Sequence, residues 1–278
     1  MAEHRRGKQI RSLGSRKAIA LPVTFLMLFV SLILLITATY YFSITRITAK
    51  TLALKTAGVE QEMLSLEKVV KFVSWSPGAY EIYEFGDFGG KFKVLPTAKT
   101  LVLNLTDSST FYDVFYNSSV GEALYELAPS EEDLGDVFLK GDSRAIINQS
   151  SSTMAQLYLT QGIERYELAL SYRPLAGTSV TGSSSGKPVN SLRVYIINLN
   201  ASETITRLGA FRLKISCLDV KSTSLTYNFT SPLTSLTIKA DLDSIVDEVS
   251  LPISSNAQGA LVNLETIVCS VKMEDIGW

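Results

Sequence analysis

The sequence predicts a mainly β protein with one long α-helix at its N-terminus. Three observations predict this fold class. Residues 18–45 form an uncharged, apolar run of 28 residues, residues 52–73 repeat apolar side chains with a helical period, and the chain from residue 80 onward alternates apolar and polar residues as strands do. With 278 residues, of which 46% are hydrophobic, the chain can bury a core of substantial size.

The apolar run predicts a transmembrane helix over residues 18–45. At about 1.5 Å per residue the run spans roughly 42 Å, which exceeds the roughly 30 Å hydrocarbon layer of a bilayer. A cleaved secretory signal has a shorter apolar core of about 7 to 15 residues and a small-x-small cleavage site after it, a pattern that this run does not show. We therefore interpret the run as an anchor in contact with membrane lipid.

A basic tail, residues 1–17, precedes the anchor. It carries six Lys or Arg residues against Glu3 alone, whereas the residues shortly after the anchor include only Arg46, Lys50 and Lys55. An excess of positive charge marks the cytoplasmic side of a membrane helix. The predicted topology is a single-pass cell-membrane protein with a cytoplasmic N-terminus and an extracellular C-terminal domain. Because the rest of the chain is mildly acidic, no nucleic-acid partner is expected.

A second helical segment, residues 46–76, is predicted to be an extracytoplasmic stalk. Pro77 and Gly78 end this helix, because proline cannot continue it and glycine favours the turn. Its apolar residues form one seam: Leu52, Val59, Met63, Leu66, Val70 and Val73. Two interpretations of the seam stay open. It packs on the β domain of its own chain, or it contacts equivalent helices of neighbouring subunits.

The remainder of the chain is predicted to be an antiparallel, sandwich-like β head that divides into two β units. Short runs rich in Val, Ile, Thr, Tyr and Phe are separated by turn residues, which is typical of such folds. A stretch rich in Ser and Gly, residues 177–190, predicts a linker. The expected division is β unit 1 over 77–176, the linker, and β unit 2 over 191–278. Candidate strands include residues 100–105, 123–127, 154–160 and 166–172.

Five asparagines stand in N-x-Ser/Thr sequons, the acceptor pattern for N-linked glycans. Each is in a polar or strand-edge setting, and each is predicted as a glycosylation site, although a chain so rich in Ser and Thr contains some sequons by chance. The five are Asn104, Asn117, Asn148, Asn200 and Asn228.

The only cysteines, Cys217 and Cys269, are predicted to lie on the buried faces of two strands, because apolar residues alternate with each of them. An extracellular location permits a disulfide between them. We favour the bond, and two reduced cysteines in the core are the alternative.

The sequence shows no pattern that predicts catalysis, a metal site or a cofactor. The single histidine, His4, lies in the basic tail, so the head has no imidazole for a catalytic triad or a His-based metal site. The stretch 182–187 is similar to a phosphate-binding loop. It has one residue too few between its glycines, and Pro188 stands where such a loop has a Ser or Thr for magnesium. Acidic clusters at 131–136 and 241–248 are interpreted as solvated surface, and a pair of glycosidase-like carboxylates stays open only in principle.

The junction Ser15–Val23 resembles the class III signal peptide of archaeal type IV pilin-like proteins. In that family a prepilin peptidase cuts after a small residue preceded by a basic one, just before the hydrophobic helix. The resemblance implies that Lys17, Ala18 and Ile19 are the processing residues, with the cut after Ala18. Many pilins carry a glutamate at the fifth mature position, where this chain has Val23.

The head over Gly90–Pro174 is similar to uncharacterised archaeal pilin-like surface proteins, notably in Gly141–Arg144 and Tyr172–Pro174. The resemblance implies a non-catalytic structural or interaction subunit of the cell surface. Its implied partners are the prepilin peptidase and other pilin-like subunits. The alternative is an unprocessed, signal-anchored surface protein whose β head binds a ligand, a glycan or a partner protein.

Overall fold

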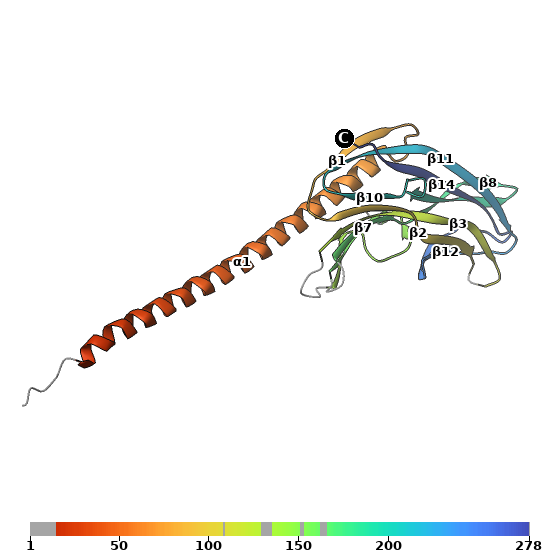
Figure 1. Cartoon of the computed structure of the whole chain (residues 1–278). Helices are drawn as coiled ribbons and strands as arrows, with labels where there is room; N and C mark the ends of the chain where they lie inside the picture. The colour runs from red at the N-terminus through yellow and green to blue at the C-terminus, as the bar shows by residue number, and fades with distance from the viewer. Residues whose placement is uncertain (1–14, 108, 129–134, 151–152, 162–165, 278) are drawn as a thin grey trace, which may run out of the picture. The chain divides into compact units, whose positions relative to one another are not determined.

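The predicted fold class is confirmed by the computed structural model, which describes residues 15–107, 109–128, 135–150, 153–161 and 166–277. One long helix, α1 (Ser15–Val73), is followed by two β-sheets (Figure 1). The chain divides into two compact units, Met1–Leu54 and Lys55–Trp278, and α1 contributes to both.

Within the first unit, α1 is an uncovered apolar helix. Every side chain from Pro22 to Lys50 is exposed. Among the described residues, α1 is the one helix long and apolar enough to cross a membrane, a property that membrane spans and signal sequences share. The helix begins at Ser15, three residues before the predicted anchor, and residues 1–14 of the predicted basic tail lie outside the described residues.

Within the second unit, the last turns of α1 belong to the core of the head. Five residues of the predicted seam are fully buried there: Val59, Met63, Leu66, Val70 and Val73. The seam therefore packs on the β domain of its own chain, which was the first of the two interpretations. The helix ends where the Ser74 hydroxyl donates to the Val70 carbonyl oxygen at 2.6 Å, and Trp75 takes a left-handed backbone conformation with φ of 69°.

The first sheet, sheet A, has six strands in the order β1 (Tyr80–Phe85), β11 (Phe211–Phe229), β14 (Ala260–Asp275), β9 (Lys187–Asn198), β8 (Leu175–Ser184) and β5 (Ile147–Asn148). Neighbouring strands are antiparallel except for two parallel pairs, β14 with β9 and β5 with β8.

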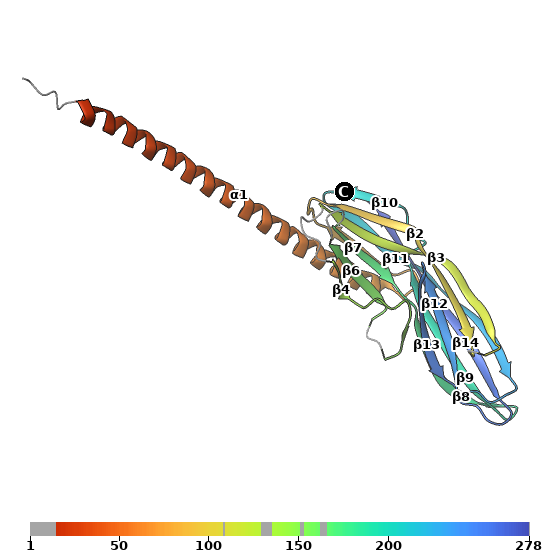
Figure 2. The same ribbon diagram turned by 90° about the horizontal axis from the view of Figure 1, so that it is seen from below.

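The second sheet, sheet B, is antiparallel and has eight strands. Seven of them follow the order β13 (Ile245–Pro252), β12 (Ser235–Leu242), β2 (Lys91–Thr106), β3 (Tyr112–Leu127), β7 (Tyr166–Tyr172), β6 (Ala155–Gln161) and β4 (Gly135–Lys140). The eighth, β10 (Ile205–Leu208), pairs with β2. Figure 2 shows β4, β6 and β7 beside the end of α1, with β12 and β13 further along the head.

The core has two parts. In the first, the end of α1 packs against both sheets, and the buried aromatic rings of Phe85 and Phe211 stack with centroids 5.0 Å apart. In the second, the two sheets pack directly on each other through aliphatic side chains such as Leu103 and Val262. The end of α1 and the two sheets thus form one head. The predicted stalk is part of that head from Val59 onward.

The predicted linker at 177–190 is wrong, because this stretch forms most of a β-hairpin. Strands β8 and β9 pair across a turn at Ser185 and Gly186, both of which have positive φ. Sheet A also combines strands from both sides of the stretch, so units 77–176 and 191–278 are not separate. Small Ser, Thr and Gly residues suit this hairpin because the end of β8 is exposed and needs no bulky side chains for packing.

Candidate functional site

The first candidate site is the exposed stretch of α1 from Pro22 to Thr45, called here the apolar segment. It contains no charged residue, and apolar side chains lie all around the helix, unlike the one-sided seam further on. The hydroxyls of Thr37, Thr39 and Thr45 each donate to the carbonyl oxygen four residues earlier, at 2.8 to 2.9 Å. These bonds satisfy the polar groups inside the helix, as an environment without water requires.

The predicted processing residues Lys17, Ala18 and Ile19 lie together in the first turns of α1. Pro22 lies inside the same helix, about two turns after its start at Ser15. In a helix interior a proline removes a backbone hydrogen bond and clashes with the preceding turn, at a cost of about 3 kcal/mol. Because α1 begins at Ser15, Pro22 lies at an energetically unfavourable position inside the helix.

The second candidate site is on the head, where a buried arginine holds a partly exposed loop. Arg173 follows β7 and is 1% exposed. Its Nη1 donates to the carbonyl oxygens of Asp142 and Arg144, both at 3.1 Å, and forms an ion pair with the Asp142 carboxylate. Its Nη2 donates to the Thr153 carbonyl oxygen at 3.3 Å. Arg173 therefore fixes residues 141–146, called here the clasped loop, between β4 and β5.

Other polar contacts hold the clasped loop from both sides. Gln156 Nε2 donates to the carbonyl oxygens of Asp142 at 2.7 Å and Arg144 at 3.0 Å. The Ala145 backbone N–H donates to Asp247 Oδ2 at 2.7 Å. The guanidinium groups of Arg144 and Arg173 hold the pKa of the Asp142 carboxyl well below its usual range. Asp142 is thus a stable anion at the centre of the loop.

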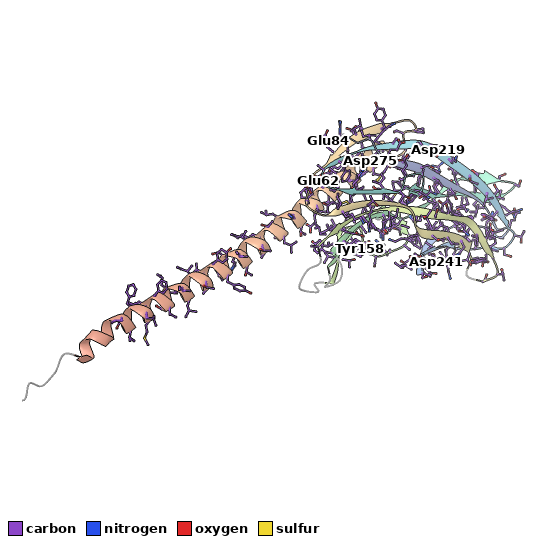
Figure 3. The ribbon with its side chains drawn as sticks, viewed as in Figure 1. Glu62, Glu84, Tyr158, Asp219, Asp241 and Asp275 are labelled. Carbon is purple, nitrogen blue, oxygen red and sulfur yellow. The ribbon has the colours of Figure 1, made fainter. Side chains whose placement is uncertain are left out.

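A cavity of about 400 Å³ lies beside the clasped loop and is called here the head pocket. Its aromatic wall is formed by Phe138 and Tyr158, whose ring centroids lie 5.6 Å apart at an interplanar angle of 30°. Tyr158 lies on the lower side of the head in Figure 3. Polar lining comes from Ser143 of the clasped loop, from Ser171 and Gln156 of two neighbouring strands, and from Lys99 and Asp243. The head pocket therefore combines an apolar surface with hydrogen-bonding groups, as small-molecule sites do.

The five predicted glycosylation sites differ in accessibility. Asn117 on β3 and Asn228 on β11 are exposed. Asn148 and Asn200 are half-buried, and Asn200 Nδ2 donates to the Ser119 carbonyl oxygen at 3.2 Å. Asn104 is 9% exposed in β2, an inner strand of sheet B. The expected solvent-facing setting of Asn104 is therefore wrong for the folded head.

The two cysteines are buried on neighbouring strands, Cys217 on β11 and Cys269 on β14, as the alternation predicted. They are free thiols in the structure, with 3.6 Å between their Sγ atoms. Burial raises the pKa of the Cys269 thiol, and the Trp75 backbone N–H donates to its Sγ at 3.3 Å. The disulfide between them stays a prediction.

The remaining polar stretches take ordinary structural roles. Residues 182–187 lie in the β8–β9 hairpin. Asp241 Oδ1 accepts from the Ser244 backbone N–H at 2.9 Å in the turn between β12 and β13. Of the acidic cluster at 131–136, residues 131–134 lie outside the described residues. Within the described ranges, no three His, Cys, Asp or Glu side chains gather as a metal site would require.

No protein-family model, no curated protein and no solved structure matches the chain. The pilin-like resemblance therefore depends on the junction Ser15–Val23 and on the architecture, a long apolar helix followed by a β-rich head. No relative confirms it.

Proposed function

We propose that this chain is a membrane-anchored, pilin-like subunit of the cell surface, structural or interacting in role and not catalytic. The observation that carries the proposal is the contrast within α1. From Pro22 to Thr45 the helix carries no charged side chain, is apolar on every side and is exposed, whereas from Val59 it buries a single seam in the head. Burying apolar surface is worth about 25 cal/mol per Å², so an uncovered helix of this length favours lipid or neighbouring helices over water.

The charge distribution supports the orientation. Six basic residues precede the apolar segment, and the sequons all follow it. This distribution supports a tail in the cytoplasm and a head outside the cell. In a filament, the same apolar segment would pack against its copies in other subunits.

Processing by a prepilin peptidase is supported by Pro22. Cleavage after Ala18 makes Pro22 the fourth residue of the mature chain. The first four backbone N–H groups of a helix have no partner within the helix, so the missing N–H of proline costs little there. Cleavage would thus relieve the unfavourable setting that Pro22 has in the helix from Ser15.

The mature N-terminus tests this proposal. We expect the intact mass of the protein purified from its native membrane to correspond to a chain that begins at Ile19. Ala18→Phe, which places a bulky residue before the cut, should retain the leader, whereas Ala20→Ser two residues later should be processed normally. A wild-type chain that keeps Met1–Ala18 would contradict processing and favour the unprocessed, signal-anchored alternative.

The head pocket favours a second candidate function, the binding of a saccharide at the cell surface. The faces of Phe138 and Tyr158 offer an apolar wall for the C–H groups of a sugar ring. Ser143 and Ser171 offer hydroxyls within the same cavity, which suit the ring's own hydroxyls. The clasp by Arg173 supports this role because it fixes Ser143 before a ligand arrives.

Binding of the detergent-solubilised full chain to an array of neutral oligosaccharides tests the second function. We expect the wild-type chain to retain at least one oligosaccharide and Tyr158→Ala to lose it, because the variant removes half of the aromatic wall. Tyr112→Ala is the matched control, since Tyr112 is an exposed tyrosine that does not line the head pocket. Equal retention by the two variants would exclude the head pocket as the binding site.

A further inference from the structure

Two long strands of the head each have one side without a neighbouring strand among the described residues. In sheet A, β1 pairs with β11 only over Phe211–Ser216, so residues 218–229 of β11 pair with β14 alone. In sheet B, β7 pairs with β3 only over Ala123–Leu127. The Ser119 carbonyl oxygen accepts from Asn198 and Asn200, and the Gly121 N–H donates to Asn198 Oδ1 at 3.4 Å, so that residues 112–118 of β3 are the part that pairs with β2 alone. We call these segments the β11 edge and the β3 edge.

The two edges lie close together where residues of β11 meet the start of β3. The Tyr227 hydroxyl of the β11 edge donates to Asp113 Oδ2 of the β3 edge at 2.6 Å. The ring of Phe111, just before β3, lies 5.2 Å from those of Tyr227 and Phe229. Both edges are therefore open on the same flank of the head.

The composition of both edges makes them prone to pair with other chains. Residues 114–118 of the β3 edge and 222–229 of the β11 edge contain no charge and no proline, and they are rich in aromatic, β-branched and hydroxyl residues. On the β11 edge, residues 221–226 are exposed on both faces. An uncharged edge of this kind is a template for a further strand, and proteins normally block it.

Other edge strands of the described head carry residues that hinder pairing with a further strand. β1 carries Glu81 and Glu84, and β13 carries Asp247, Glu248 and Pro252. The free end of β8 is interrupted by a bulge between Val180 and Gly182. The β3 edge carries Asp113 and the β11 edge carries Asp219 and Lys221, each near the start of its edge. The stretches 114–118 and 222–229 beyond them have no charge, and each contains a sequon asparagine, Asn117 or Asn228.

These two are also the sequons whose asparagines are exposed. Asn104 is buried in an inner strand, Asn148 stands on the two-residue strand β5, and Asn200 lies outside the strands and is half-buried. A glycan is bulky and strongly hydrated, so one on each edge would exclude an incoming strand. We propose that Asn117 and Asn228 carry the glycans of the head, and that these glycans keep its two open edges from pairing with a second copy of the chain.

This inference rests on the extracellular head of the proposed function, since glycans must be added on that side. Mapping of glycopeptides from the native protein is the first test. We expect glycans at Asn117 and Asn228 and none at Asn104. Glycans confined to Asn148 or Asn200 would overturn the inference and leave the extracellular head intact, whereas protease resistance of the head on whole cells would overturn the proposed function itself.

The second test removes each glycan but keeps its asparagine unchanged. Ser119→Ala and Thr230→Ala destroy the two sequons, and Ser119→Thr and Thr230→Ser are matched controls that keep them. Ser119 contributes only its carbonyl oxygen to the hydrogen bonds from Asn198 and Asn200, so the alanine variant preserves them. In size-exclusion chromatography with light scattering of the full chain in detergent, we expect the alanine double variant to shift to dimers and larger species and the control double variant to match wild type.

A rescue variant separates edge pairing from misfolding. Thr223→Lys places a charge on the exposed, uncharged part of the β11 edge. Added to the alanine double variant, it should return part of the protein to the wild-type elution position, because a misfolded head would not respond to one surface charge. An alanine double variant that elutes as wild type does would overturn the inference.

Discussion

Replacing Arg173 with alanine is expected to lower the free energy of unfolding of the head by about 3 kcal/mol or more. The side chain is fully buried and donates to three backbone carbonyl oxygens as well as to the Asp142 carboxylate. Hydrogen bonds from a charged donor contribute about 1.5 to 3 kcal/mol each, and the alanine also leaves a cavity. Asp142 is 44% exposed and regains water, so the carbonyl bonds dominate the loss.

Arg144→Ala is the matched control for this prediction. Arg144 binds the same carboxylate, with Nη2 2.7 Å from Asp142 Oδ2, but its own side chain is half exposed. Exposed ion pairs contribute about 1 kcal/mol or less. Urea denaturation of the full chain in detergent, followed by tryptophan fluorescence, measures both variants. Equal losses from Arg173→Ala and Arg144→Ala would show that Arg173 does not hold the clasped loop.

A third variant, Arg173→Lys, separates the effect of charge from that of the guanidinium geometry in the same experiment. Lysine keeps the charge, but its single ammonium cannot reach the carbonyl oxygens on both sides as the planar guanidinium does. We therefore expect only a partial recovery of stability relative to Arg173→Ala. Full recovery would show that charge alone, and not the fork geometry, holds residues 141–146 in place.

The helix and the existence of strands were predictable because they depend on local patterns. The seam that includes Met63 and Leu66 is visible as a helical period, and both residues are buried as that period implies. The candidate strand 166–172 matches β7 residue for residue. Strand extent was harder to predict. β3 begins at Tyr112, well before the predicted start at residue 123, because its first half is an edge whose polar residues need no burial.

Two features depend on residues that are distant in sequence: the bonds from Arg173 to the clasped loop, and the burial of Asn104. Both stretches around Asp142 and Arg173 stand out in the sequence, but 31 positions separate them and nothing local indicates that they meet. Asn104 alternates with Leu103 and Leu105, which predicts an outward side chain. It is covered because Val114 and Lys239 flank it on the two neighbouring strands. Only the sheet order, which the sequence does not show, reveals such neighbours.

The largest expected effect concerns the apolar segment, since membrane topology is all or none. Each Leu, Ile, Phe or Val near the centre of a membrane helix favours insertion by about 0.3 to 0.6 kcal/mol. The segment from Phe25 to Ile36 contains ten such residues together with Met27 and Ser31. Insertion is therefore strongly favoured, and the six basic residues of the tail oppose its transfer across the membrane.

Protease treatment of intact cells measures this topology directly. With antibodies against a tag at each terminus, we predict that the protease removes the C-terminal tag and the head while the apolar segment stays with the membrane, and that an N-terminal tag on a chain blocked in processing stays protected. A head that survives on intact cells while the first dozen residues are digested would contradict the anchored, outward-facing arrangement.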